Sequence, residues 1–140
     1  MMMKSFVTAS MISGAALFAF AAVATTTSDS SLATLGLVDL TTSSSGTAST
    51  STSIVSGYGA DKLFDDGSLT DASRYISTGS SATTPSVVTW TFHAATPVNA
   101  YLLVNTAYDQ VNRAPKQWTL EGSNDGESWM TLDTRDNETS

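Results

Sequence analysis

Residues 118–132 read WTLEGSNDGESWMTL, and this stretch decides the expected fold. Trp118 and Leu120 fall on one side of an extended chain, with polar residues between them, which is the two-residue period of a half-buried strand. Residues 123–126 follow as Ser-Asn-Asp-Gly, whose side chains tolerate positive φ and bond their own backbone. A second strand is expected from Trp129. The stretch therefore predicts a β-hairpin with one face in a core.

Two upstream segments show the same alternation. Residues 87–92 (VVTWTF) are expected to form a strand whose apolar face carries Val88, Trp90 and Phe92. Residues 98–104 are expected to form another, with four apolar residues inward: Val98, Ala100, Leu102 and Val104. Their β-branched and aromatic content favours strand over helix, and no apolar stripe of helical period follows residue 24. The sequence predicts an all-β domain.

Residues 1–24 have the organisation of a secretory signal peptide. Lys4 supplies the positive charge, residues 6–20 are largely apolar, and Ala22 and Ala24 are the small residues that a signal peptidase reads, so cleavage is expected after Ala24. The alternative is a membrane anchor, but the apolar run contains serines and falls short of the ~20 residues that a bilayer requires. The remainder is expected to be secreted, with no transmembrane span.

Composition restricts the function. The 140 residues are enough for one domain, the formal net charge is −7, and there is no cysteine. An acidic surface repels phosphate backbones, so nucleic acid is not an expected partner, and docking to anionic membranes by basic charge is disfavoured as well. Oxygen is the only abundant metal ligand. These features suit neutral sugars and calcium.

Two segments of the sequence show a specific resemblance to a known family. The pattern Trp-x-Leu-x-Gly-Ser-Asn-Asp-Gly-x-x-Trp-x-x-Leu at 118–132, together with KLFDDGSLTDASRY at 62–75, resembles the discoidin superfamily. This group of galactose-binding-like domains includes coagulation factor V/VIII type C domains and family 32 carbohydrate-binding modules. The resemblance implies a jelly-roll β-sandwich over residues 38–140 after a flexible Ser/Thr-rich segment at 25–37. It also implies a first sandwich strand at Thr47–Val55.

The resemblance covers only part of such a domain. The family continues with two or three strands after the position of Leu132, whereas this chain ends in the polar residues 133–140. We therefore expect a sandwich that lacks its last strands. The alternative is a minimal fold, or one completed by a partner.

A calcium site is expected in the loop after Phe64. Its oxygen donors are Asp65, Asp66, Thr70 and Asp71, and a hard cation takes six to eight oxygens at ~2.4 Å. In resembling domains this loop holds a structural calcium, and a glutamate from the final strand completes the coordination. That glutamate would lie beyond Ser140. The alternative is a solvated acidic turn.

A glycan-binding rim is expected between the strands of 98–104 and 118–122. Sugar recognition uses an aromatic face and planar polar side chains on loops of a rigid scaffold, and Tyr108, Asp109, Asn112 and Arg113 supply both. In carbohydrate-binding relatives comparable loops contact the ligand. The alternative is an ordinary loop in which Tyr108 packs inward.

The sequence thus predicts a non-catalytic module that binds extracellular or cell-surface carbohydrate. It shows neither a serine elbow nor a phosphate-binding glycine loop, and its one histidine, His93, is expected to be an exposed residue at a strand end. Many carboxylates lie in turns, where turn formation explains them. Two alternatives stay open: a module that recognises protein, and a fragment with no ligand of its own.

Overall fold

The structure is a computed structural model that describes residues 6–11, 16–23, 37–64, 75–81, 83–105 and 115–136. Nearly all of its regular structure is β-strand, with one short 3₁₀ helix, η1 (Ala60–Leu63). The all-β prediction is therefore confirmed. In the part of the chain that is described, no helix is both long and apolar enough to cross a membrane.

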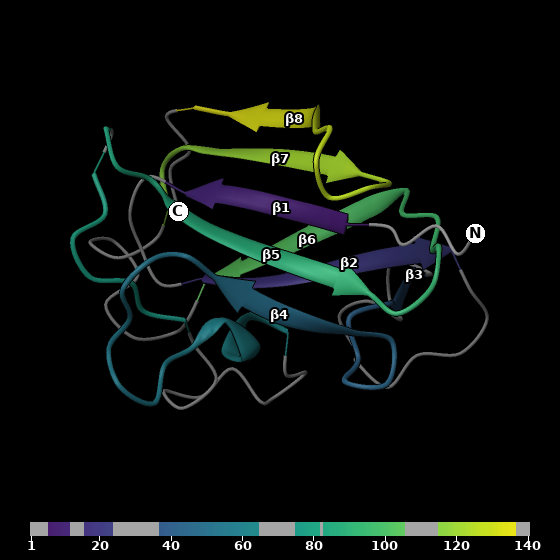
Figure 1. Cartoon of the computed structure of the whole chain (residues 1–140), viewed down its shortest axis with the longest axis horizontal. Coiled ribbons are helices and arrows are strands. Elements are labelled where there is room, and N and C mark those ends of the chain that lie inside the picture. The colour runs from purple at the N-terminus through teal and green to yellow at the C-terminus, as the bar shows by residue number, and fades with distance from the viewer. Residues whose placement is uncertain are drawn as a thin grey trace.

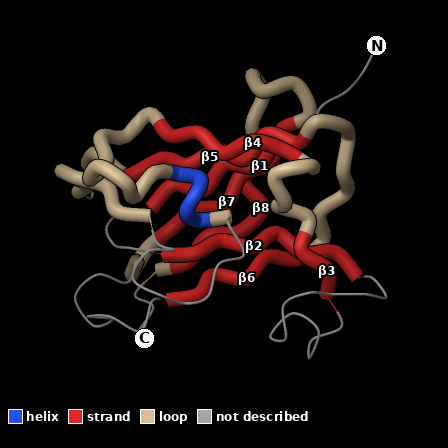
Figure 2. The backbone as a smooth tube through the Cα atoms, turned by 90° about the horizontal axis from the view of Figure 1, so that it is seen from below, coloured by secondary structure: helices blue, strands red, loops and turns tan. Residues whose placement is uncertain are grey.

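The strands form two antiparallel sheets, which lie as separate layers (Figures 1 and 2). The larger sheet has the order β4-β5-β1-β7-β8 and the smaller has the order β3-β2-β6. The strands of the larger sheet are β4 (Gly46–Thr50), β5 (Ser86–Phe92), β1 (Phe6–Met11), β7 (Trp118–Ser123) and β8 (Met130–Arg135). Those of the smaller sheet are β3 (Leu37–Asp39), β2 (Ala16–Val23) and β6 (Ala100–Asn105).

The predicted leader contributes a strand to each sheet. β1 lies between β5 and β7, and β2 lies between β3 and β6. Apolar residues such as those of 6–23 suit a buried strand as well as a leader, because both require the absence of charge. Signal-peptide function stays a prediction, and the structure adds that β1 and β2 each have a strand on both sides in their sheets.

β5 forms the centre of the core, as its alternation predicts. Ser86, Val88, Trp90 and Phe92 are buried, and the residues between them are half-buried. Phe64 stacks at a tilt on Trp90, with ring centroids 4.8 Å apart. Trp90 also lies against Gly46 in β4, where a Cβ atom would come within 2.6 Å of the indole ring. Only glycine at position 46 allows β4 and β5 to pair with this ring in place.

One end of the core is closed by residues on either side of the predicted calcium loop. Leu63 and Phe64 are buried at the end of η1, and η1 contacts both β4 and β2. Tyr75 is fully buried, and its hydroxyl group shares hydrogen bonds with Ser86 (2.6 Å) and Thr50 (3.2 Å). Leu63, Phe64 and Tyr75 together close this end of the sandwich.

The hairpin of 118–132 is present, with β7 and β8 joined through a turn in which Gly126 has φ of 79°. Leu120 is buried and Trp118 packs against the core. A β-bulge between Leu120 and Glu121 shifts the register. The second strand begins at Met130, one residue after its expected start, and Trp129 is half-buried and lies outside the core cluster.

Three other strand predictions need correction. β4 ends at Thr50, and the predicted strand to Val55 continues only as an isolated bridge between Ile54 and Ser77. In β6, Tyr101 and Leu103 pack against the core and Ala100 does not, so the predicted inward position of Ala100 is wrong, whereas that of Val98 is confirmed. Val98 and Tyr101 both pack on the core because the alternation is interrupted in the irregular residues between Val98 and β6. The side chains of Leu102 and Val104 lie outside what the structure describes. β8 also extends to Arg135, into the predicted polar tail.

Candidate functional site

The eight predicted site residues lie outside the described parts of the chain. Asp65, Asp66, Thr70 and Asp71 fall within residues 65–74, and Tyr108, Asp109, Asn112 and Arg113 fall within residues 106–114.

The flanking residues of the two segments lie at the same end of the larger sheet. β5 and β7 both run antiparallel to β1, and the first residues of both, Ser86 and Trp118, register with Met11 (Figure 1). Tyr75, which follows the first segment, bonds to Ser86. Trp118 follows the second segment by a few residues. Both segments thus rejoin the fold near the beginning of these two strands.

A hydrogen-bonded network links the two sheets at the same end. The Trp118 indole donates to the Tyr101 hydroxyl at 3.1 Å, and that hydroxyl donates to the Asp133 carboxylate. Arg135 contacts the same carboxylate at 2.8 Å. Burial and the Asp133 carboxylate raise the pKa of Tyr101, whereas the hydroxyl of Tyr101 and then Arg135 lower the pKa of Asp133. The network fixes β6 against the β7–β8 hairpin.

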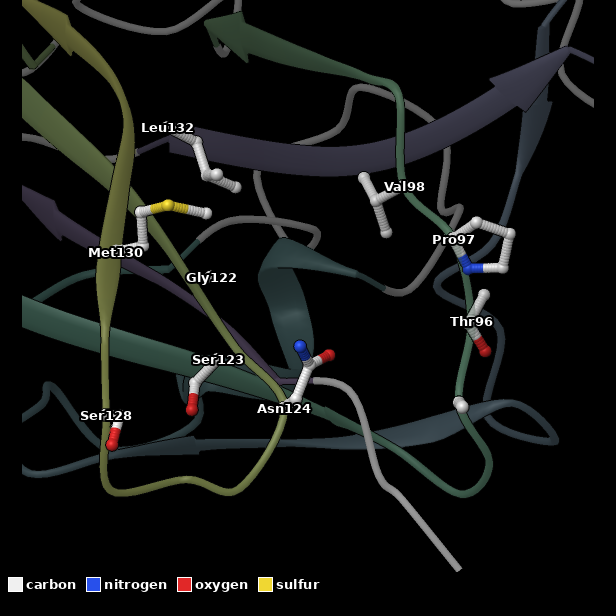
Figure 3. Close-up of a pocket in the computed structure, with 10 residues that line it drawn as sticks. Thr96, Pro97, Val98, Gly122, Ser123, Asn124, Ser128, Met130 and Leu132 are labelled. Atoms are coloured by element: carbon white, nitrogen blue, oxygen red, sulfur yellow. The ribbon is translucent and has the colours of Figure 1, made fainter.

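The opposite end of the larger sheet carries an open cleft of about 470 Å³. Figure 3 shows Met130 and Leu132 of β8 on one wall and Pro97 and Val98 on the other, with Asn124 between them. Met130 is 67% exposed and Leu132 is 48% exposed. The rim is polar and is formed by Thr96, Ser123, Asn124 and Ser128.

A second hollow of about 420 Å³ continues the cleft along β8. It shares Val98 and Leu132 with the first and extends to Tyr101 and Asp133. β6 is the last strand of the smaller sheet and β8 is the last strand of the larger sheet. The two hollows therefore lie where the inner face of the hairpin extends past the edge of β6.

The hairpin turn has a firm hydrogen-bonded frame. The Asp125 carboxylate accepts backbone N–H groups from Ser128 (2.7 Å) and Glu127 (2.8 Å), and it accepts the Ser123 hydroxyl at 2.9 Å. These donors, Ser128 first, hold the pKa of Asp125 well below its usual range. The turn therefore presents Asn124 and Ser128 at the cleft from a fixed backbone.

Chemically, the cleft is suited to binding. None of the residues that line it is titratable, so the lining offers shape, apolar surface and hydrogen bonds rather than a general acid or base. Among the described residues there is no group of three or more His, Asp or Glu side chains that could hold a metal ion. His93 is exposed at the end of β5, as predicted, and its Nδ1 lies 3.1 Å from the Ser44 carbonyl.

Sequence reasoning missed this cleft. Its walls come from residues 95–98 and 122–132, which are far apart along the chain. A Cβ atom at Gly122 would lie 2.9 Å from the Leu132 side chain, so these residues of β7 and β8 share a face, and the sequence alone does not show that this face is left uncovered. Comparison of the chain with protein-family models, with curated proteins and with solved structures finds no match.

Proposed function

We propose that the chain is a secreted, non-catalytic carbohydrate-binding module built on a discoidin-like jelly-roll sandwich. One observation carries the proposal: Tyr75 and Trp118, which follow residues 65–74 and 106–114, lie at the same end of the larger sheet. Loops grouped at one end of a rigid β-scaffold are the usual location of a binding site. The sequence resemblance supports the same reading.

In this mechanism a structural calcium orders the first loop and the second loop contacts the sugar. Asp65, Asp66, Thr70 and Asp71 would hold the ion, since carboxylate and hydroxyl oxygens are its preferred ligands. Tyr108 would pack against the apolar face of a sugar ring, and Asp109, Asn112 and Arg113 would bond to its hydroxyl groups. Tyr75 and Trp118 give both loops a rigid base.

The glycan part of the proposal is tested by titrating the full chain with neutral mono- and oligosaccharides by calorimetry. Tyr108→Ala is expected to weaken binding about two- to twelvefold, because an aromatic contact contributes about 0.5–1.5 kcal/mol. Asn124→Ala, in the cleft at the opposite end, is the matched control and is expected to bind like the wild type. Absence of sugar binding in the wild type, or loss only in the Asn124 variant, would contradict the proposal.

The calcium part is tested by thermal unfolding with calcium and with a chelator. Calcium is expected to raise the melting temperature of the wild type, because a ligand that binds only the folded state stabilises it. Asp71→Asn is expected to abolish this increase. Asp61→Asn is the control, since Asp61 lies just before the loop and contacts only the neighbouring Lys62 at 3.6 Å among the salt bridges described. An equal calcium response in both variants would show that the ion binds elsewhere.

A module that recognises protein is the second candidate, and the cleft favours it. Met130 and Leu132 are large apolar side chains left exposed beside Pro97 and Val98, and methionine is enriched in protein interfaces. In this case Met130→Ser would weaken partner binding and Tyr108→Ala would not. The two candidate functions are therefore distinguished by these two variants.

A further inference from the structure

The open cleft combines an apolar surface with an acidic border on one side. Met130 and Leu132 supply the exposed apolar surface of β8, and the facing segment 94–100 contains no charged residue. The hairpin of residues 118–136 contains a single base, Arg135, and five acids: Glu121, Asp125, Glu127, Asp133 and Asp136. The hairpin therefore brings an excess of negative charge to the apolar surface.

The uncompensated negative charge beside the cleft lies at its turn end. Asp125 and Glu127 belong to the hairpin turn that forms the polar rim, both are exposed, and neither forms an ion pair among the residues that the structure describes. Backbone N–H groups lower the pKa of Asp125 and keep its carboxylate ionised. At the far end, Asp133 pairs with Arg135 at 2.8 Å. The turn end is therefore anionic, whereas the charges at the far end compensate each other.

The apolar surface continues from the turn end toward the far end. Figure 3 shows Met130 and Leu132 on one wall and Val98 on the other. Leu132 and Val98 also line the second hollow, together with Leu120. The two hollows have volumes of about 470 Å³ and 420 Å³, and small-molecule sites have volumes in this range. A ligand that fills both would place an apolar chain along β8.

We propose that the cleft binds a cationic amphiphile, a small molecule with a protonated amine at one end of an apolar chain. The ammonium group lies at the hairpin turn, where the charges of Asp125 and Glu127 attract it. The apolar chain lies against Met130 and Leu132 and reaches the second hollow. An uncharged chain of the same length gains only the apolar contact, and an anion is repelled at the turn. This site is independent of the proposed carbohydrate loops at the other end of the sheet.

The charge requirement is tested by calorimetry of the full chain with three decyl probes, each below its micelle concentration. The probes are decylammonium, the uncharged decyl ether of tetraethylene glycol, and decyl sulfate. We expect one decylammonium per chain, bound at least about threefold more tightly than the ether at low salt, with a difference that shrinks as salt is added. Decyl sulfate should bind most weakly. Equal binding of the three probes, or no binding of decylammonium, would overturn the proposal.

Three variants test the location of the site. Leu132→Asn should weaken the binding of decylammonium and of the ether alike, by about fivefold, because both chains lose apolar contact. Glu127→Gln should weaken only decylammonium, by about two- to fivefold. Glu121→Gln removes the same charge on the opposite face of β7, since Glu121 alternates with the buried Leu120, and it should bind like the wild type. Wild-type binding by Leu132→Asn, or equal effects of the two glutamate variants, would contradict this location.

Discussion

β5 and β8 belong to the same sheet, yet they differ completely in burial. The inward residues of β5 are between 0% and 3% exposed, whereas Met130 and Leu132 of β8 are 67% and 48% exposed. Both strands alternate apolar and polar residues in sequence. The difference lies in what faces them: β5 is covered by Phe64 and Tyr75, and the inner face of β8 extends past the edge of β6. Alternation identifies a face, and the opposite layer decides whether that face is buried.

The largest expected effect tests this difference directly. Phe92→Ala should destabilise the chain by about 3–5 kcal/mol, because Phe92 is fully buried and its removal leaves a cavity. Leu132→Ala should cost less than ~1 kcal/mol, since half of that side chain is already in water. Urea unfolding of both variants measures the two values. Similar losses would mean that the inner face of β8 is covered in solution.

The next largest loss of stability is expected at Gly46, where β4 packs closely against β5. A Cβ atom at position 46 would lie 2.5 Å from the Thr91 carbonyl oxygen and 2.6 Å from the Trp90 ring. Gly46→Ala should therefore destabilise the chain by about 1–3 kcal/mol through overpacking. Ser49→Ala, at an exposed site on the same strand, should change stability by less than ~0.5 kcal/mol. Equal values in a thermal melt would mean that β4 can move away from Trp90 freely.

A smaller effect is expected from the hydrogen bonds that the buried Tyr75 hydroxyl group forms. Tyr75→Phe removes a hydroxyl group that bonds to Ser86 and Thr50, and it leaves the buried Ser86 with one partner fewer. The expected loss is about 1–2 kcal/mol. The double variant with Ser86→Ala should be less destabilised than the sum of the two single variants, because no partner is then left unpaired. Additive losses in urea unfolding would exclude this coupling.

The exposed turn of the hairpin should give a weak acid dependence. Backbone donors from Ser128 and Glu127 lower the pKa of Asp125 in the folded state. The stabilisation is therefore complete above the unfolded pKa of about 3.9 and is lost as the pH falls toward the folded pKa. Asp125→Ala should flatten the pH dependence of unfolding below about pH 4. An unchanged profile would assign the acid dependence to other carboxylates, such as Asp133.

The smallest effect is expected for Met130, the most exposed of the β5 and β8 residues compared above. Met130→Ser should alter stability by less than ~0.5 kcal/mol, because little apolar surface is lost from the core. The same variant should bind less of a hydrophobic dye, since Met130 forms part of the open cleft. Unchanged dye binding would mean that the cleft is closed in solution.

Local rules predicted the parts of the fold that depend on neighbours in sequence. The alternation of 87–92 and the turn at 123–126 both gave correct expectations, because strand period and turn chemistry act over a few residues. The inward position of Ala100 was mispredicted, since Val98 and Tyr101 both pack on the core across an irregular connection.

Other features depend on long-range pairing and could not be predicted in this way. An apolar run such as 6–23 is compatible with a leader and with a central strand, and only its pairing with β5, β7 and β6 distinguishes the second. The cleft likewise requires the relative position of β6 and β8. The predicted calcium and glycan residues stay predictions.

The pairing of β1 with β7 also has a consequence for the order of events during synthesis. β1 is synthesised well before its partner at residues 118–123. At ~5–20 residues per second, residues 6–11 would remain without this partner for roughly 5–20 seconds. If residues 1–24 serve as a signal peptide, as the sequence predicts, the targeting machinery has this interval in which to bind them. Pairing with β7 and recognition as a leader would then use the same six residues.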